Sequence, residues 1–137
     1  MSKTDFASKD LKDRVEALEE LQYNVGDEIT VGGGNSMYAG RIGWSGLEMY
    51  LTIPLNKAVN PNVSRFVYNG SYAGTVYACT SNSAIDITTL FNNATISTLK
   101  NEESNIILHI VFNAKPFSFN DGAVNMMFMK RLRFICQ

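Results

Sequence analysis

The spacing of apolar residues changes once along the chain, at Gly26, and this change divides the sequence into two parts. Before it, apolar residues recur at intervals of four, three and seven, which is the period of an amphipathic helix. After it, apolar and polar residues alternate, which is typical of β-strands buried on one face. The sequence therefore predicts a helical segment over residues 1–25 and a β domain over residues 26–137.

The helical segment has the pattern of a short parallel coiled coil. Its a and d positions form a narrow apolar seam interrupted by one polar residue: Leu11, Val15, Leu18, Gln22 and Val25. Arg14 at g and Glu19 at the following e position have the spacing of an ion pair between neighbouring helices. Two heptads are few for a coiled coil, and an ordinary amphipathic helix lying on its own domain is the alternative. We expect the seam to join two or three copies of the chain.

The β domain is predicted to be an antiparallel β-sandwich or jelly roll. Residues 104–113 alternate most regularly and carry apolar residues on both faces, so we expect both faces to be covered. Asn69-Gly70 predicts a hairpin turn after a strand at 65–68, and Pro54 predicts that the strand at 49–55 is an edge strand or bends there. Further strands are expected at 28–31, 74–80, 84–89, 94–99 and 124–136. Strands that alternate with helices would indicate a parallel sheet, and the sequence has no such alternation.

The charge distribution excludes several classes of function. The first 28 residues hold 12 of the 25 charged residues, and the net charge of the whole chain is -1. Only Lys130, Arg131 and Arg133 form a basic cluster, which is a weak patch for nucleic acid. No apolar run approaches the roughly 18 residues that span a bilayer, and the polar N-terminus does not resemble a secretory signal peptide. We therefore expect neither nucleic acid nor membrane as a partner.

The residues that enzymes use for catalysis are scarce. His109 is the only histidine, so it would have to serve any serine or cysteine nucleophile as the base. Its position in a strand favours instead a core or interface histidine between apolar neighbours. With Cys79 and Cys136 far apart in the sequence and expected to stay reduced, no zinc site can be composed. We expect no catalytic residues, no metal and no cofactor.

Polar and aromatic side chains suited to binding are plentiful. Asn, Ser and Thr together make up 34 of the 137 residues, and several aromatic residues stand next to turns. Aromatic faces stack on sugar rings and amide groups bind hydroxyls, although the same residue types also serve protein-binding surfaces or simply pack in the core and turns. The candidate ligand-binding residues are Tyr38, Arg41, Trp44, Tyr68, Asn69 and Tyr72. The stretch 37–46 is the least strand-like aromatic segment.

The layout resembles the fibre and receptor-binding proteins of tailed bacteriophages. The shared features are the charged heptad stretch, a short strand after Val25-Gly26-Asp27-Glu28 and a charge-poor β domain at the C-terminus. The segment Leu51-Thr52-Ile53-Pro54-Leu55-Asn56-Lys57-Ala58 is similar to a stretch in small phage or prophage structural proteins of gut bacteria.

The resemblance implies a homotrimer in which a parallel helix bundle carries three β heads. Such heads bind glycans or proteins of the host surface, and related ones decorate capsids. The expected location is the virion, after assembly in the bacterial cytoplasm, with other virion proteins as partners. A capsid-decorating or baseplate protein without a host ligand and a lectin-like adhesin module of cellular origin are the alternatives. The resemblance assigns no binding residue.

Overall fold

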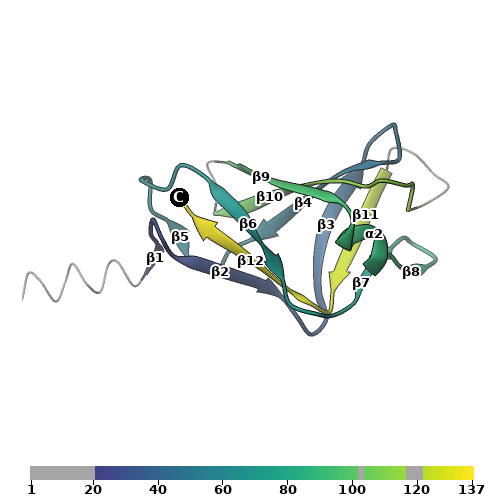
Figure 1. Ribbon diagram of the computed structural model, residues 1–137, viewed down its shortest axis with the longest axis horizontal. Coiled ribbons are helices and arrows are strands. Elements are labelled where there is room, and N and C mark those ends of the chain that lie inside the picture. The colour runs from purple at the N-terminus through teal and green to yellow at the C-terminus, as the bar shows by residue number, and fades with distance from the viewer. Residues whose placement is uncertain (1–20, 102–103, 117–121) are drawn as a thin grey trace, which may run out of the picture.

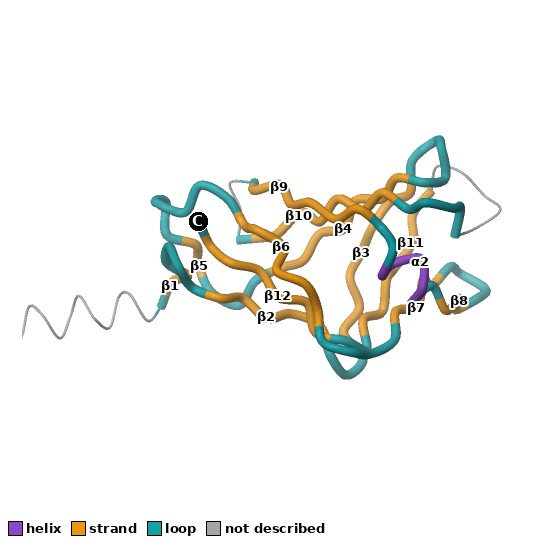
Figure 2. The backbone as a smooth tube through the Cα atoms, in the orientation of Figure 1, coloured by secondary structure: helices purple, strands orange, loops and turns teal. Residues whose placement is uncertain are grey.

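A computed structural model describes residues 21–101, 104–116 and 122–137. The described part is mainly β, with one short helix, as Figures 1 and 2 show. In chain order the elements are β1 (Gln22–Tyr23), β2 (Glu28–Gly32), β3 (Ser36–Ile42), β4 (Glu48–Pro54), β5 (Ala58–Val59), β6 (Phe66–Ser71), β7 (Val76–Cys79), β8 (Ala84–Asp86), α2 (Thr88–Asn92), β9 (Thr95–Lys100), β10 (Asn105–Val111), β11 (Gly122–Phe128) and β12 (Arg131–Cys136). The expected mainly β, antiparallel fold is confirmed.

Two antiparallel sheets face each other across one hydrophobic core. The larger has seven strands in the order β8-β7-β11-β3-β4-β10-β9, and the smaller has three in the order β2-β12-β6. A two-residue parallel pair, β1 with β5, lies apart from both sheets. In Figure 1 the smaller sheet lies over one end of the larger one.

The core is formed by alternate residues of both sheets. In β10, Ile106, Leu108 and Ile110 are fully buried, while the residues between them are only partly buried. In the smaller sheet, Leu132 and Phe134 of β12 point into the same core. The period-two pattern thus reproduces the buried face of each strand. The outer face of β10 is not covered by another layer within the described residues, contrary to expectation, and Val111 there is exposed.

Three pairs of strands pass from one sheet to the other at a shared corner. β2 leads into β3, β6 leads into β7, and β11 leads into β12. The strand order β2-β12-β6 of the smaller sheet therefore matches the order β3-β11-β7 within the larger sheet. Backbone hydrogen bonds join the three links: Gly33 N donates to the carbonyls of Phe128 and Lys130, Met129 N to Thr75, and Tyr72 N to Arg131. Figure 2 shows the links converging at the bottom of the view. The corner therefore continues the strand pairing from one sheet into the next.

The predicted helix does not extend to residue 25. Gln22 lies in β1, where it pairs with Ala58, and Val25 lies exposed in the turn that follows. Hydrogen bonds to the rest of the domain hold this segment: Tyr23 Oη donates to Asn56 Oδ1, and Gly26 N donates to the carbonyl of Cys136. The other seam and pairing residues, Leu11, Arg14, Val15, Leu18 and Glu19, lie outside the described residues.

Asn69-Gly70 does not form the predicted hairpin turn. Strand β6 continues through both residues, and its partner β12 shifts register there: Leu132 pairs with Ser71 but Phe134 pairs with Tyr68. One extra residue on β6 makes a β-bulge, and Gly70 has the positive φ, +81°, that such a bulge favours. A bulge and a hairpin both use glycine in this conformation, so the dipeptide alone does not distinguish them.

Other predicted strand boundaries also differ. The stretch 37–46, which is the least strand-like aromatic segment by its sequence, nevertheless contains most of β3. The stretch 124–136 is two strands that belong to different sheets. The strand predicted at 84–89 ends at Asp86, and its last two residues begin α2. β4 is not an edge strand, because it pairs with both β3 and β10. Pro54 is tolerated because it is the last residue of that strand, where a missing N–H donor costs little.

Candidate ligand-binding site

A group of exposed side chains beside a pocket lies at the corner where the chain crosses between the sheets. The link Met129–Lys130 runs between two glycine-containing links. A Cβ atom on Gly32 would lie 2.4 Å from the carbonyl oxygen of Lys130, and one on Gly74 would lie 2.5 Å from Lys130 Cβ. Because glycine alone lacks this atom, it lets the three links pass side by side.

Lys130 holds the corner from within. Its side chain is only 4% exposed, and its Nζ donates a hydrogen bond of 2.7 Å to Asn92 Oδ1 in α2. The same ammonium lies 5.4 Å from the ring centre of Phe91. Burial lowers the pKa of Lys130, because desolvation disfavours the charged form. The residue therefore fastens α2 to the corner.

On the outer face of the smaller sheet, Tyr72 covers Arg133. The β6 bulge lies opposite Arg133, and a bulged strand bends where the extra residue is inserted. Tyr72 follows the end of β6, and its ring centre lies 5.0 Å from the guanidinium carbon of Arg133. This is the distance of a cation–π contact. The contact fixes the orientation of both groups, while Tyr72 remains 53% exposed.

Arg131 projects from the same face of β12 as Arg133, because side chains alternate along a strand. It lies over Gly33, where a Cβ would come within 3.2 Å of Arg131 Cγ. Within the described ranges, neither guanidinium has an ion pair or a hydrogen bond, and the buried Nε of Arg133 has no acceptor. We call Tyr72, Arg131 and Arg133 the corner site.

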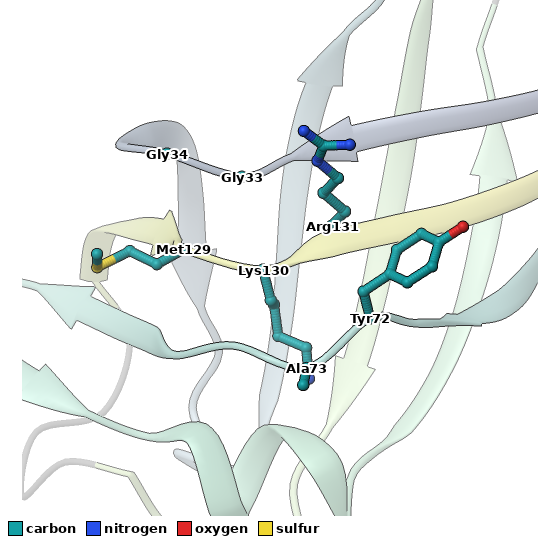
Figure 3. Close-up of a pocket in the computed structure, with 7 residues that line it drawn as sticks. All are labelled: Gly33, Gly34, Tyr72, Ala73, Met129, Lys130 and Arg131. Atoms are coloured by element: carbon teal, nitrogen blue, oxygen red, sulfur yellow. The ribbon is translucent and has the colours of Figure 1, made fainter.

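A shallow pocket of about 360 Å³ adjoins the corner site. Figure 3 shows its lining, with Arg131 and Lys130 pointing to opposite sides of the chain. The lining consists of Gly33, Gly34, Tyr72, Ala73, Met129, Lys130 and Arg131. Glycine and alanine supply little side-chain bulk, so Tyr72 and Arg131 stand out from the surface around them. The arrangement can hold a small ring and a charged group, and the amine of Lys130 points away from Arg131 and donates to Asn92 Oδ1.

Three of the six predicted binding residues lie on β6 or just after it. Tyr72 belongs to the corner site, and Asn69 lies exposed in the bulge opposite Arg133. Tyr68 packs inward, with its ring 5.6 Å from that of Phe134. Burial raises the pKa of Tyr68, and a hydrogen bond with Ser71 and the charge of Arg133 partly offset this effect. Tyr68 therefore packs on the core side of the smaller sheet, beneath the corner site, and does not face a ligand.

The other three predicted residues lie along β3 and beyond its far end. Tyr38 faces the core side, 5.9 Å from the ring of Phe128, and its hydroxyl accepts a hydrogen bond from Gly32 N. Arg41 lies on the outer face of the larger sheet, in register with Ala123 and Tyr50. Trp44 is 81% exposed in the β3–β4 hairpin. Since β3 begins at the corner, its seven residues place Trp44 roughly 20 Å away.

Arg131 and Arg133 were not among the predicted binding residues. Their signal in the sequence is the basic cluster at 130–133, which is weak as a nucleic-acid patch. The spacing of two places both arginines on one face of a strand, while Lys130 between the glycine links points inward. What the sequence could not reveal is that Tyr72, about 60 residues earlier, lies against Arg133.

A second polar cluster lies on the outer face of the larger sheet. His109 Nε2 lies 2.6 Å from Glu48 Oε1, its ring stacks on Tyr50 at 4.5 Å, and its Nδ1 lies 3.4 Å from Ser97 Oγ. His109 is only partly buried and does not lie in the core, while its role as an interface histidine stays a prediction. Its neighbours in the ladder are Tyr50 and Ser97, on a face exposed to solvent.

Serine, histidine and a carboxylate are the residue types of hydrolytic triads, but the geometry of this cluster differs from theirs. An oxyanion hole needs N–H groups aimed at the reacting carbonyl oxygen. Backbone N–H groups of β-strands lie in the plane of the sheet, so those of β9 and β10 do not point over Ser97. The cluster therefore acts as a cross-strand contact between β4, β9 and β10.

Comparisons with known proteins identify no relative. No protein-family model, no curated protein and no solved structure matches the chain. In the described ranges, no three His, Cys, Asp or Glu residues are grouped as metal ligands. The same residues include no helix of the length and apolarity needed to cross a membrane.

Proposed function

We propose that the chain is a non-enzymatic virion structural protein of a tailed bacteriophage, with a trimeric fibre head that attaches to a glycan or protein of the host surface. The proposal rests on the resemblance in layout together with the β-rich head. The β-sandwich supplies a rigid scaffold, and the N-terminal heptads supply the means of trimerisation.

The observation that carries the attachment role is the exposed ring of Tyr72 fixed on Arg133. An aromatic side chain that is already held in one orientation loses little conformational entropy when a ligand stacks on it. An open pocket beside the ring gives a ligand room to lie against the glycine links. Binding surfaces commonly combine Tyr with Arg in this way.

A capsid-decorating or baseplate protein without a host ligand is the second candidate. The exposed apolar residues on the outer face of the larger sheet favour it, because exposed apolar side chains are typical of surfaces that contact another protein. They are Met37, Tyr50, Leu99 and Val111. Both candidates predict a trimer, but only the first predicts binding to cells.

The test combines a mass measurement with a cell-binding assay of the full chain. Multi-angle light scattering should give the mass of a trimer at micromolar concentration, and a fluorescent derivative should bind some members of a panel of bacterial strains. A monomer across that concentration range would contradict the fibre assembly. Binding to purified virions but to none of the strains would favour the second candidate.

A further inference from the structure

The corner site carries positive charge that the described residues do not balance. Among the residues that the structure describes, Arg131 and Arg133 have no carboxylate within ion-pair distance, and the buried Arg133 Nε has no acceptor. Glu28 of the same sheet is in register with Ile135 instead of with either arginine. A buried donor that lacks an acceptor is unfavourable, and two cations on one face repel each other.

Three other basic residues of the domain, Arg65, Lys100 and Lys130, have acceptors. Arg65 donates two hydrogen bonds to Gln137 Oε1, at 3.1 and 2.8 Å. Lys100 donates to the carbonyl of Val63, and Lys130 donates to Asn92. The unbalanced pair at the corner is therefore a local feature, in a chain whose net charge is only -1.

We infer that the corner site binds an anionic saccharide, with a sugar ring against Tyr72 and a carboxylate or phosphate group on the guanidinium groups of Arg131 and Arg133. This inference rests on the proposed attachment function and names the chemistry of its ligand. Guanidinium groups bind both kinds of oxyanion through charge-assisted hydrogen bonds. The ligand would thus bring an acceptor to two guanidinium groups that have none among the described residues, while the buried Nε of Arg133 stays beneath the surface.

The ring of Tyr72 favours a saccharide over other anions. Arg133 lies at one face of the ring, yet more than half of the residue is exposed and available to the C–H face of a sugar. The open, shallow pocket accommodates a ring at its edge. Two guanidinium groups are too few to hold a nucleic acid, whose binding needs many phosphate contacts. An acidic peptide would use the arginines but gain less from the aromatic platform.

The experiment measures binding of the full chain by isothermal titration calorimetry to matched pairs of probes. The carboxylate pair is tetragalacturonate and its methyl ester, which share the same sugars and differ in charge. The phosphate pair is phosphorylated and unphosphorylated mannotetraose, and tetraglutamate represents an acidic peptide. We expect at least one anionic saccharide to bind roughly tenfold or more tightly than its neutral partner, with an affinity that falls as salt rises. The acidic saccharide that binds more tightly shows whether the site prefers a carboxylate or a phosphate group.

Variants locate the site. Arg131→Gln and Arg133→Gln should each weaken binding of the acid roughly tenfold or more. Arg131→Gln should leave the neutral partner unaffected, whereas Arg133→Gln also removes the contact that orients Tyr72 and should weaken both partners. Arg41→Gln removes the same charge from an exposed position on the other sheet and should change the affinity little. Because Arg131 is exposed, its variant should fold even if the half-buried Arg133 variant does not, and thermal unfolding checks both.

The outcomes separate this inference from the proposed function. Equal binding of acid and neutral partner, with both lost in Tyr72→Ala, would overturn the anionic ligand and leave glycan attachment standing. No binding of any acid, or tighter binding of tetraglutamate than of either saccharide acid, would also overturn the inference. Failure of the chain to bind any cell or virion would contradict the proposed function itself.

Discussion

At the corner, the absence of a single carbon atom at Gly32 and at Gly74 allows three backbone links to lie within hydrogen-bonding distance. The same close approach directs Lys130 inward and leaves Arg131 outside. Residue identity therefore matters most where the chain crosses between sheets. Two glycines of one link, Gly32 and Gly34, provide a matched test, because both have positive φ but only one is crowded.

We expect Gly32→Ala to destabilise the protein by about 3 kcal/mol or more, since the added Cβ both strains a left-handed backbone and collides with the Lys130 carbonyl. Gly34→Ala should cost only about 1 kcal/mol, because nothing lies within 4 Å of its Cβ. Urea unfolding of the two variants measures the difference. Equal losses would mean that the corner is not as tightly packed as described.

Cys136 gives a prediction for alkaline pH. Burial, and then the nearby charge of Asp27, raise the pKa of its thiol above the ordinary 9.0, with Lys100 partly offsetting them. In the unfolded chain the thiol ionises first as the pH rises. The stability that the raised pKa of Cys136 contributes to the folded state is therefore complete below about pH 9 and is lost as the pH rises through the pKa of the folded state.

The stability advantage of the wild type over Cys136→Ala should accordingly shrink as the pH rises from about 8 to about 10. Urea unfolding at several pH values measures this difference, in which the effects of the tyrosines cancel except for Tyr23, whose pKa the charge of Cys136 also raises. Cys79→Ala removes the other thiol and serves as the control variant. An advantage that stays constant with pH would contradict the prediction.

At the scale of elements, the alternation of apolar and polar residues predicted most strands, because it follows from burial of one face. The prediction failed where a short motif is compatible with two local structures. The fully buried residues of β10 are the ones that its sequence pattern selects. Asn69-Gly70 fits both a hairpin and a bulge, and the choice depends on the pairing of β12 with β6, which is remote in sequence. Likewise, the corner between β11 and β12 interrupts an apolar run at Met129–Lys130 without proline or glycine in the link itself.

Helix α2 and strand β7 are joined by a hydrogen-bond chain that can be tested. Val76 N donates to Thr88 Oγ1 over 2.9 Å, and Thr88 Oγ1 donates to Asp86 Oδ1 over 2.6 Å. The backbone N–H of Thr88 also donates to Asp86 Oδ1, over 3.0 Å, and the two bonds that Thr88 donates to this carboxylate lower the pKa of Asp86. Thr88→Val keeps the shape but removes the hydroxyl, leaving the N–H of the buried Val76 without its acceptor.

We expect Thr88→Val to cost about 1–3 kcal/mol of stability, the penalty of an unsatisfied buried donor. Thr89→Val, at an exposed position one residue later, should change stability by less than about 0.5 kcal/mol. Denaturant unfolding compares the two. A similar effect in both variants would show that the hydroxyl of Thr88 does not support the junction.

The cross-strand cluster around His109 belongs to the same scale. Replacing His109 by Gln removes the ring that stacks on Tyr50 and contacts Glu48, so we expect a modest loss of stability. Ligand and cell binding should remain unchanged, because the cluster lies on the larger sheet, away from the corner site. Loss of binding in a folded His109→Gln protein would indicate that the functional site lies on this face instead of at the corner site.

At the scale of the whole molecule, the sequence predicted the class of fold but only part of the site. Tyr72 was among the candidates because it stands beside a turn, but its partner Arg133 follows from how two sheets meet. Trp44 looked equally suitable, and the structure places it in a different hairpin. A binding surface composed from separate strands depends on tertiary packing that no local pattern records.

The most direct test of the account compares Tyr72→Ala with Trp44→Ala in one cell-binding assay. Both variants remove an exposed aromatic side chain, but only Tyr72 is held by an arginine beside a pocket. On a strain that the wild-type chain binds, we predict that Tyr72→Ala reduces binding at least tenfold and that Trp44→Ala leaves it within about twofold. Full binding by Tyr72→Ala, with loss in Trp44→Ala, would contradict the account.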